Sequence, residues 1–233
     1  MEWIVIVDGD SNDLQWLADN LKTPELSFER KDDTWVLKSS YIIPQLGYDS
    51  VRNKATELLQ AINVDMMLKD RLSKHIVVND VIKVSDDGKK TFVKNISCTV
   101  VISDRCEAVV TRNGVVVEDN RPKINADFVK LSQKDSNVQK VFRLMASELD
   151  WVNLYRIYEV IESDIGGLKI LADKGWASES KLKLFKHTAN HPGATGDIAR
   201  HGALNSQPPQ VPMSIQEARN LVKNLVSNWL QSK

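Results

Sequence analysis

Residues 3–21 read WIVIVDGDSNDLQWLADNL, and this stretch decides how the N-terminal half of the chain folds. Its first residues, Trp3 to Val7, are strand formers, and the Asp8-Gly9-Asp10 that follows them is a turn signal. The apolar residues after the turn then recur at helical spacing, at Leu14, Leu17, Ala18 and Leu21. The stretch therefore predicts a strand, a turn and a helix that Asp10 or Ser11 caps.

The chain beyond this unit predicts a hairpin, a second helix and more strands. Residues 26–30 and 34–39 are strand-like and flank a polar turn, and apolar residues at helical spacing predict a helix over 50–62. From 75 to 119 short strand-like runs alternate with turns. The strongest turn signal there is Arg112-Asn113-Gly114-Val115, because Asn and Gly accept the positive φ of a tight hairpin. We therefore expect a largely antiparallel sheet.

A polar stretch from Glu118 to Asn137, which we expect to be irregular, separates this strand-rich part from a part with helical patterning. In the latter, Ser178 or Ser180 is placed to cap one helix and Ser214 to cap another. Because strands and helices are segregated along the chain, we predict an α+β fold. A mixed α+β domain is expected over residues 1–122 and an all-helical domain over 137–233.

Composition narrows the classes of function. The 31 Lys and Arg residues balance 31 Asp and Glu residues, so the chain has no overall charge that would attract nucleic acid or an anionic membrane. Cys98 and Cys106 make no disulfide framework, and the acidic start fits neither a signal peptide nor a membrane span. The sequence also lacks the glycine-rich motifs that bind nucleotides. We expect a cytoplasmic protein with no membrane association and no cofactor.

The segment 185–202 reads FKHTANHPGATGDIARHG and holds three of the four histidines in the chain. If residues 180–190 are helical, an apolar stripe that includes Phe185 faces the core, and His187 lies on the opposite, polar side. His191 shares that side if the last turn persists as far as Pro192. The 191–213 loop is then expected to return Arg200 and His201 to the end of this helix.

Several roles are open to the histidine segment. Its side chains could fasten the loop through hydrogen bonds to one another and to free carbonyls at the helix end. A metal could bind to His187, His191 and either His201 or Asp197, but the spacing matches no zinc signature, and we expect no metal. The Asp8-Gly9-Asp10 turn with Asp13 could similarly hold Mg²⁺, but helix capping is the favoured role of these carboxylates, because the sequence has no further acidic motif to complete a metal site.

Phosphate chemistry is the remaining role. Four cations surround the histidines and could contact nucleic-acid phosphates, namely Lys181, Lys183, Lys186 and Arg200. In a metal-independent ribonuclease built on this segment, His187 or His201 would be the general acid or base. Arg200 and Lys186 would stabilise charge on the phosphate oxygens, and Asn190 would orient the substrate.

The helical half, with this basic segment ending in Arg200-His201-Gly202 and a closing helix, resembles HEPN domains over about 95 residues. The resemblance implies an all-helical fold, and ribonuclease members of that family use an arginine, a few spacer residues and a histidine. Here lysine replaces arginine: Lys186 stands four spacers before His191, and Lys181 five before His187. Lysine lacks the bidentate fork of guanidinium, so the resemblance favours a member that binds or scaffolds.

These observations favour a binding or regulatory protein with a basic, histidine-bearing groove in its helical domain. Its partner would be RNA or another protein. A metal-independent ribonuclease of the HEPN type is the alternative function.

Overall fold

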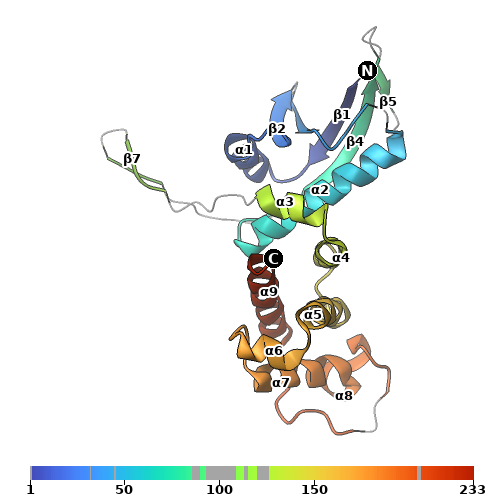
Figure 1. Cartoon of the computed structure of the whole chain (residues 1–233), viewed down its shortest axis with the longest axis vertical. Coiled ribbons are helices and arrows are strands. Elements are labelled where there is room, and N and C mark those ends of the chain that lie inside the picture. The colour runs from blue at the N-terminus through green and yellow to red at the C-terminus, as the bar shows by residue number, and fades with distance from the viewer. Residues whose placement is uncertain are drawn as a thin grey trace. The chain divides into compact units, whose positions relative to one another are not determined.

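The computed structural model describes residues 2–31, 33–44, 46–85, 90–92, 109–112, 115–119, 126–203 and 206–233. Its contacts divide the chain into two compact units, Met1–Lys130 and Leu131–Lys233. The strands lie in the first unit and most of the helices in the second, which confirms the predicted α+β class (Figure 1). Both cysteines, Cys98 and Cys106, lie outside the described residues.

The first unit is built on a five-stranded sheet with strand order β2-β3-β1-β4-β5, in which every neighbouring pair is antiparallel. Its elements are β1 (Glu2–Asp8), α1 (Ser11–Asn20), β2 (Leu26–Lys31), β3 (Thr34–Ser39), α2 (Tyr48–Leu68), β4 (Val77–Val84) and β5 (Lys90–Phe92). A separate pair, β6 (Val109–Arg112) and β7 (Val115–Asp119), flanks the predicted turn at 113–114, whose own residues are outside the described part.

The central strands bury one face against the helices. Val5 of β1 lies opposite Leu37 of β3 on one side and Val81 of β4 on the other, and all three are almost completely buried. The pairing of β1 with β4 then shifts, because Ile6 lies opposite Asp80 but Val7 lies opposite Val78. Asn79 is therefore an extra residue in β4, and the strand has a β-bulge at this point.

Side-chain caps explain the helix starts that the sequence predicts. The carboxylate of Asp10 accepts hydrogen bonds from the backbone N–H groups of Asn12 at 2.9 Å and Asp13 at 3.2 Å. At the other end of the chain, Ser214 and Glu217 form a reciprocal capping box. Both caps satisfy donors that a helix start leaves free.

Helix α2 is longer than predicted, since it runs to Leu68 rather than ending at residue 62. The polar residues beyond that point are buried with partners. The Asn63 amide donates to the carbonyl of Ile76 at 2.9 Å and accepts from its N–H at 3.0 Å, and Asp65 pairs with Lys69 at 2.6 Å. A buried polar side chain with satisfied hydrogen bonds is compatible with a core helix, although it interrupts the apolar pattern.

The second unit consists of helices around an aromatic core. Its elements, with the helix that leads into it, are α3 (Ala126–Ser132), α4 (Ser136–Met145), α5 (Trp151–Ile165), α6 (Leu168–Asp173), α7 (Glu179–Asn190), α8 (Pro192–Thr195), the 3₁₀ turn η1 (Gly196–Ile198) and α9 (Ile215–Gln231). The expectation of an irregular stretch up to Asn137 is thus wrong, because α3 lies within it. Val129 and Ser132, three residues apart, are the buried positions of this short helix.

Phe185 of α7 is the centre of that core. Its ring lies 6.3 Å from the ring of Trp151, 6.1 Å from Tyr155 and 5.5 Å from Tyr158, all three on α5. Such offset and edge-on aromatic contacts stabilise packing beyond simple area burial. Within the described ranges, no helix is both long enough and apolar enough to cross a membrane.

Candidate functional site

Helix α7 carries the polar side chains of the candidate site. The hydroxyl of Ser178 accepts a hydrogen bond from the N–H of Lys181 at 3.3 Å and so fixes where the helix begins. Leu182, Phe185 and Ala189 are fully buried and anchor one side, as the helical wheel predicts. The opposite side of α7 is consequently held outward in a defined orientation.

Helix α7 ends at Asn190, where Pro192 requires extended backbone before it. His191 leaves the helix with φ −103° and ψ 114°, and it is only 4 % exposed. The last helical turn thus does not persist to His191, so the condition under which His191 would share the polar side is not met. Its Nδ1 accepts the N–H of Gly193 at 3.0 Å, so its Nε2 carries the proton and donates to the carbonyl of Ser206 at 2.6 Å.

Side chains of α7 also fasten the far end of the 191–213 loop. Nε2 of His187 lies 2.9 Å from the carbonyl oxygen of Gln207 and must donate, because a carbonyl only accepts. The hydroxyl of Thr188 accepts from the N–H of Met213 at 3.1 Å. The fastening role that the sequence allows for the histidine segment is thus what His187 and His191 perform.

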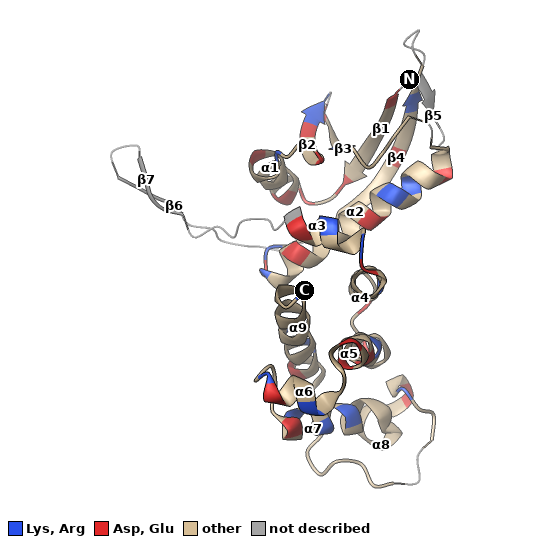
Figure 2. Cartoon of the chain, in the orientation of Figure 1, with Lys and Arg blue, Asp and Glu red and all other residues tan. Residues whose placement is uncertain are grey.

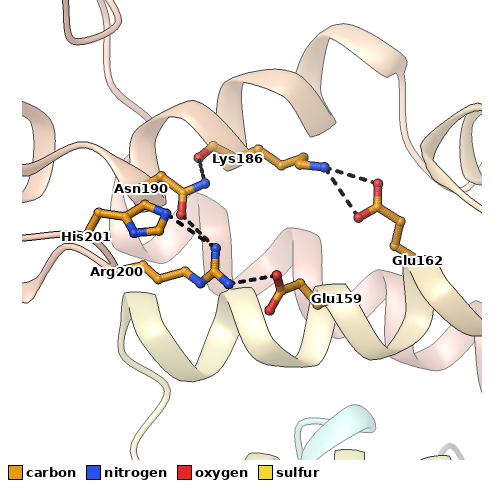
Figure 3. A network of polar contacts seen from close by, with 6 residues as sticks. All are labelled: Glu159, Glu162, Lys186, Asn190, Arg200 and His201. Atoms are coloured by element: carbon orange, nitrogen blue, oxygen red, sulfur yellow. Dashed lines mark hydrogen bonds and ion pairs between the residues drawn. The ribbon is translucent and has the colours of Figure 1, made fainter. Parts of the chain in front are cut away.

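Arg200 joins the returning loop to two helices (Figure 3). Its Nη2 donates to Oε1 of Glu159 on α5 at 2.9 Å, and its Nη1 lies 3.4 Å from Oδ1 of Asn190 and 3.5 Å from Nε2 of His201. Because a guanidinium only donates, Nε2 of His201 accepts and the ring proton is on Nδ1. The backbone N–H of Arg200 also donates to the carbonyl of Ala189 at 2.9 Å.

Lys186 forms the second half of the same network (Figure 3). Its ammonium lies 3.2 Å from Oε1 and 3.4 Å from Oε2 of Glu162, and 5.4 Å from the ring centre of Tyr158. Its carbonyl accepts the side-chain amide of Asn190 at 2.9 Å. Burial, together with the neighbouring Glu162 carboxylate, raises the pKa of Tyr158 far above its ordinary value, so this phenol stays protonated.

Helix α5 contacts two cations in the same way, each through one tyrosine ring and one glutamate. The guanidinium of Arg200 lies 4.4 Å from the ring centre of Tyr155, and Glu159, four residues after that tyrosine, accepts its hydrogen bond. The next tyrosine and glutamate, also four residues apart, hold Lys186 in the same way. Residues 155–162, YRIYEVIE, therefore contain the signal that the sequence analysis missed.

A shallow hollow of about 520 Å³ opens beside this network. It collects side chains from α6, from the polar side of α7 and from the returning loop, and its lining consists of Leu168, Lys183, Lys186, His187, Asn190 and His201.

Of the seven residues that the sequence predicts for the site, the structure brings six together. Lys183, Lys186, His187, Asn190 and His201 line the hollow, and Arg200 holds two of them in place through its guanidinium. Lys181 is exposed on α7 away from this lining. The hollow exists because the loop after Pro192 folds back onto α7, as expected.

The cations around the hollow are not a purely basic patch. Lys183 lies 2.6 Å from Glu179, so that three of the four predicted cations have a carboxylate within 3.2 Å. The hydrogen bond from Lys183 lowers the pKa of Glu179 below its ordinary value. Figure 2 shows acidic and basic residues mixed over α5, α6 and α7. The site therefore has little net charge of its own.

The histidines do not converge on a metal. The rings of His187 and His191 are 5.9 Å apart and edge-on, and each Nε2 is turned to a different backbone carbonyl. Across the described ranges, no three His, Cys, Asp or Glu side chains are grouped to hold an ion. The acidic residues at and after the end of β1 have other partners: Asp10 caps α1, and Asp8 pairs with Lys74 at 2.9 Å.

Comparison with known proteins finds no family model, no curated protein and no solved structure that matches this chain. The resemblance of the helical half to HEPN domains therefore stays a prediction.

Proposed function

We propose that this chain is a cytoplasmic binding or regulatory protein whose helical unit accepts a phosphate-bearing partner, such as RNA, at the hollow beside α7. One observation carries the proposal: two lysines, two imidazoles and an amide converge on the same hollow. The two ammonium groups, the second amide proton of Asn190 and the ring N–H of His201 can donate hydrogen bonds to phosphate oxygens, whereas His187 already donates to the carbonyl of Gln207. Because the loop is already fastened to α7, these donors are positioned before the ligand arrives, which lowers the entropic cost of binding.

Binding is favoured over cleavage by the state of the cations. Lys186 and Arg200 each have a carboxylate partner, so neither offers a free charge for developing negative charge on a phosphate. A ligand must compete with Glu162 and Glu159 for them. We therefore expect weak to moderate affinity with strong salt dependence.

The metal-independent ribonuclease is the second candidate, and one contact favours it. His201 is exposed and accepts a hydrogen bond from Arg200 at Nε2, so an unprotonated ring nitrogen stands beside a cation and the amide of Asn190. If a ribose hydroxyl displaces the long 3.5 Å contact of Arg200 from Nε2, a neutral imidazole in that position can act as a general base towards that hydroxyl. His187 is less suited to this role, because its Nε2 is already engaged by Gln207.

Anisotropy of a fluorescein-labelled single-stranded RNA, titrated with the full chain in EDTA, tests the binding proposal. Lys183→Glu reverses a charge in the lining and should weaken binding about tenfold, with a smaller salt slope. Lys140→Glu makes the same change at an exposed site on α4 and should have little effect. An equal loss of RNA affinity in Lys183→Glu and Lys140→Glu would contradict the proposal, and so would the absence of RNA binding by the unaltered protein.

The same reactions, resolved on a gel, separate the two candidates. EDTA-resistant cleavage that is lost in a His187→Ala/His201→Ala double variant would favour the ribonuclease. Intact RNA throughout, with binding that depends on Lys183, would favour the binding protein.

A further inference from the structure

The first unit has a second hollow, at the end of the sheet where β1 leads into α1. Its volume is about 480 Å³, within the range of ordinary small-molecule sites. The lining residues that matter here come from four elements, namely Val7 of β1, Ser11 and Asn12 of α1, Trp35 of β3 and Asn79 of β4. The hollow thus combines an indole and aliphatic wall with short polar side chains.

The β-bulge in β4 contributes one of those polar side chains. Because Ile6 pairs with Asp80 and Val7 with Val78, Asn79 has no residue opposite it on β1. It is exposed and lines the hollow. Bulges recur next to functional sites because they redirect a side chain that regular pleating would point elsewhere.

Two side-chain amides in this hollow are available to a ligand. Within the described residues, neither the Asn12 nor the Asn79 side chain has a hydrogen-bond partner. Each amide presents a donor and an acceptor next to each other. Such a pair matches the neighbouring donor and acceptor atoms on the edge of a nucleobase, as when Asn binds adenine.

The charges at this hollow cancel locally. Asp8 pairs with Lys74 at 2.9 Å, and Arg30 pairs with Asp33 at 3.0 Å. The first amides of α1, which could otherwise attract an anion, already donate to Asp10. An uncharged ligand therefore fits this hollow better than a phosphate.

We propose that this hollow, defined by Trp35, Asn12 and Asn79, binds an uncharged nucleobase or nucleoside. The half-buried indole of Trp35 supplies a face on which a planar base stacks. The amides of Asn12 and Asn79 bind the polar edge of that base. This site shares no residue with the hollow beside α7, so the proposal made here does not depend on the function proposed for that hollow.

Calorimetric titration of the full chain with adenosine, guanosine, cytidine and uridine tests the proposal. At least one nucleoside should bind, and its monophosphate should bind no more tightly, because the phosphate gains nothing from a neutral rim. Trp35→Ala should weaken the binding about tenfold or more, as expected for a lost base stack. Asn79→Ala should weaken it about fivefold, whereas Asn53→Ala at an exposed position of α2 should leave it unchanged.

Several outcomes would overturn the proposal. The first is that no nucleoside gives a heat of binding. The second is that binding is unchanged in both Trp35→Ala and Asn79→Ala. The third is that a monophosphate binds more tightly than its nucleoside. Binding of methyl glucoside or cellobiose in place of the nucleosides would likewise assign the hollow to a sugar. Asn79 is exposed, so its variant reports on the site even if the Trp35 variant loses its fold, which circular dichroism monitors.

Discussion

The guanidinium of Arg200 donates to the carboxylate of Glu159 across 2.9 Å, and this contact joins the loop after α7 to the middle of α5. The same side chain stacks on Tyr155 and contacts Asn190. One residue of a long loop is thus bound to two helices. These contacts limit where the loop can lie beside the hollow.

Arg200→Ala should lower the free energy of unfolding by about 1 kcal/mol, because it removes a partly exposed ion pair and a cation–π contact. Urea denaturation followed by circular dichroism measures the change. Arg143→Ala removes an exposed arginine on α4 and should cost less than about 0.5 kcal/mol. If both variants unfold at the same urea concentration, Arg200 does not fasten the loop.

His191 should matter more for stability than His187, although both bind loop carbonyls. His191 is buried, and His191→Ala leaves the N–H of Gly193 and the carbonyl of Ser206 without partners, at a cost of about 2–3 kcal/mol. His187 is exposed, so water replaces its bond to Gln207 and His187→Ala should cost less than about 1 kcal/mol.

Thermal and urea unfolding of the two alanine variants compare these costs, and ¹⁵N spectra of the imidazoles give a second readout. The ring of His191 should show an unprotonated Nδ1 and a protonated Nε2 at neutral pH, because Gly193 donates to Nδ1. The opposite tautomer, or equal destabilisation by both substitutions, would contradict this assignment.

Lys233 closes the helical unit by bridging Asp135, at 2.7 Å, and Asp164, at 2.8 Å. Burial disfavours the charged carboxyls, but hydrogen bonds, first among them those from Lys233, outweigh it and lower the pKa of both aspartates below the ordinary 3.8. Burial disfavours the charged ammonium too, yet the same bonds raise the pKa of Lys233 above 10.5. The lowered pKa of the aspartates and the raised pKa of Lys233 both mean that the ion pairs stabilise the folded state at neutral pH.

Lys233→Ala should therefore destabilise the protein by about 1–2 kcal/mol at pH 7. The stability that the aspartates contribute is present above their unfolded pKa and is lost as pH falls below about 4. The stability that Lys233 contributes is present below its unfolded pKa and is lost as pH rises past about 10.5. The difference in the free energy of unfolding between the unaltered protein and the variant should therefore decrease both at acidic pH and at strongly alkaline pH. Urea midpoints across pH measure it, with Lys140→Ala as the control, and a difference that stays constant with pH would contradict the assignment.

Much of the fold follows from local signals. The first strand, the cap by Asp10 and the cap by Ser214 each depend on neighbours in sequence, and each is found as predicted. The end of α2 is not found as predicted, because the buried Asn63 interrupts the apolar pattern, and its hydrogen-bond partner, Ile76, lies 13 residues further along the chain. Long-range hydrogen bonds of this kind leave no trace in apolar periodicity.

In the candidate site, too, the features set by local sequence are predicted and those set by distant residues are not. The sequence places His187 and Arg200 near the end of α7, because helix geometry and a proline restrict the chain there. It does not place Glu159 and Glu162 beside the cations, since these carboxylates come from another helix. A basic cluster in sequence therefore becomes a mixed-charge surface in the folded protein.

Those carboxylates give the sharpest test of how the hollow works. Glu162→Gln keeps the size of the side chain but removes the charge that holds Lys186, so the ammonium becomes available to a phosphate. Binding of the labelled RNA should tighten about fivefold, with a steeper salt dependence. Glu148→Gln neutralises an exposed carboxylate in the turn before α5 and controls for the change in net charge. An unchanged or weaker affinity in Glu162→Gln, or equal tightening in both variants, would show that Lys186 does not contact the ligand.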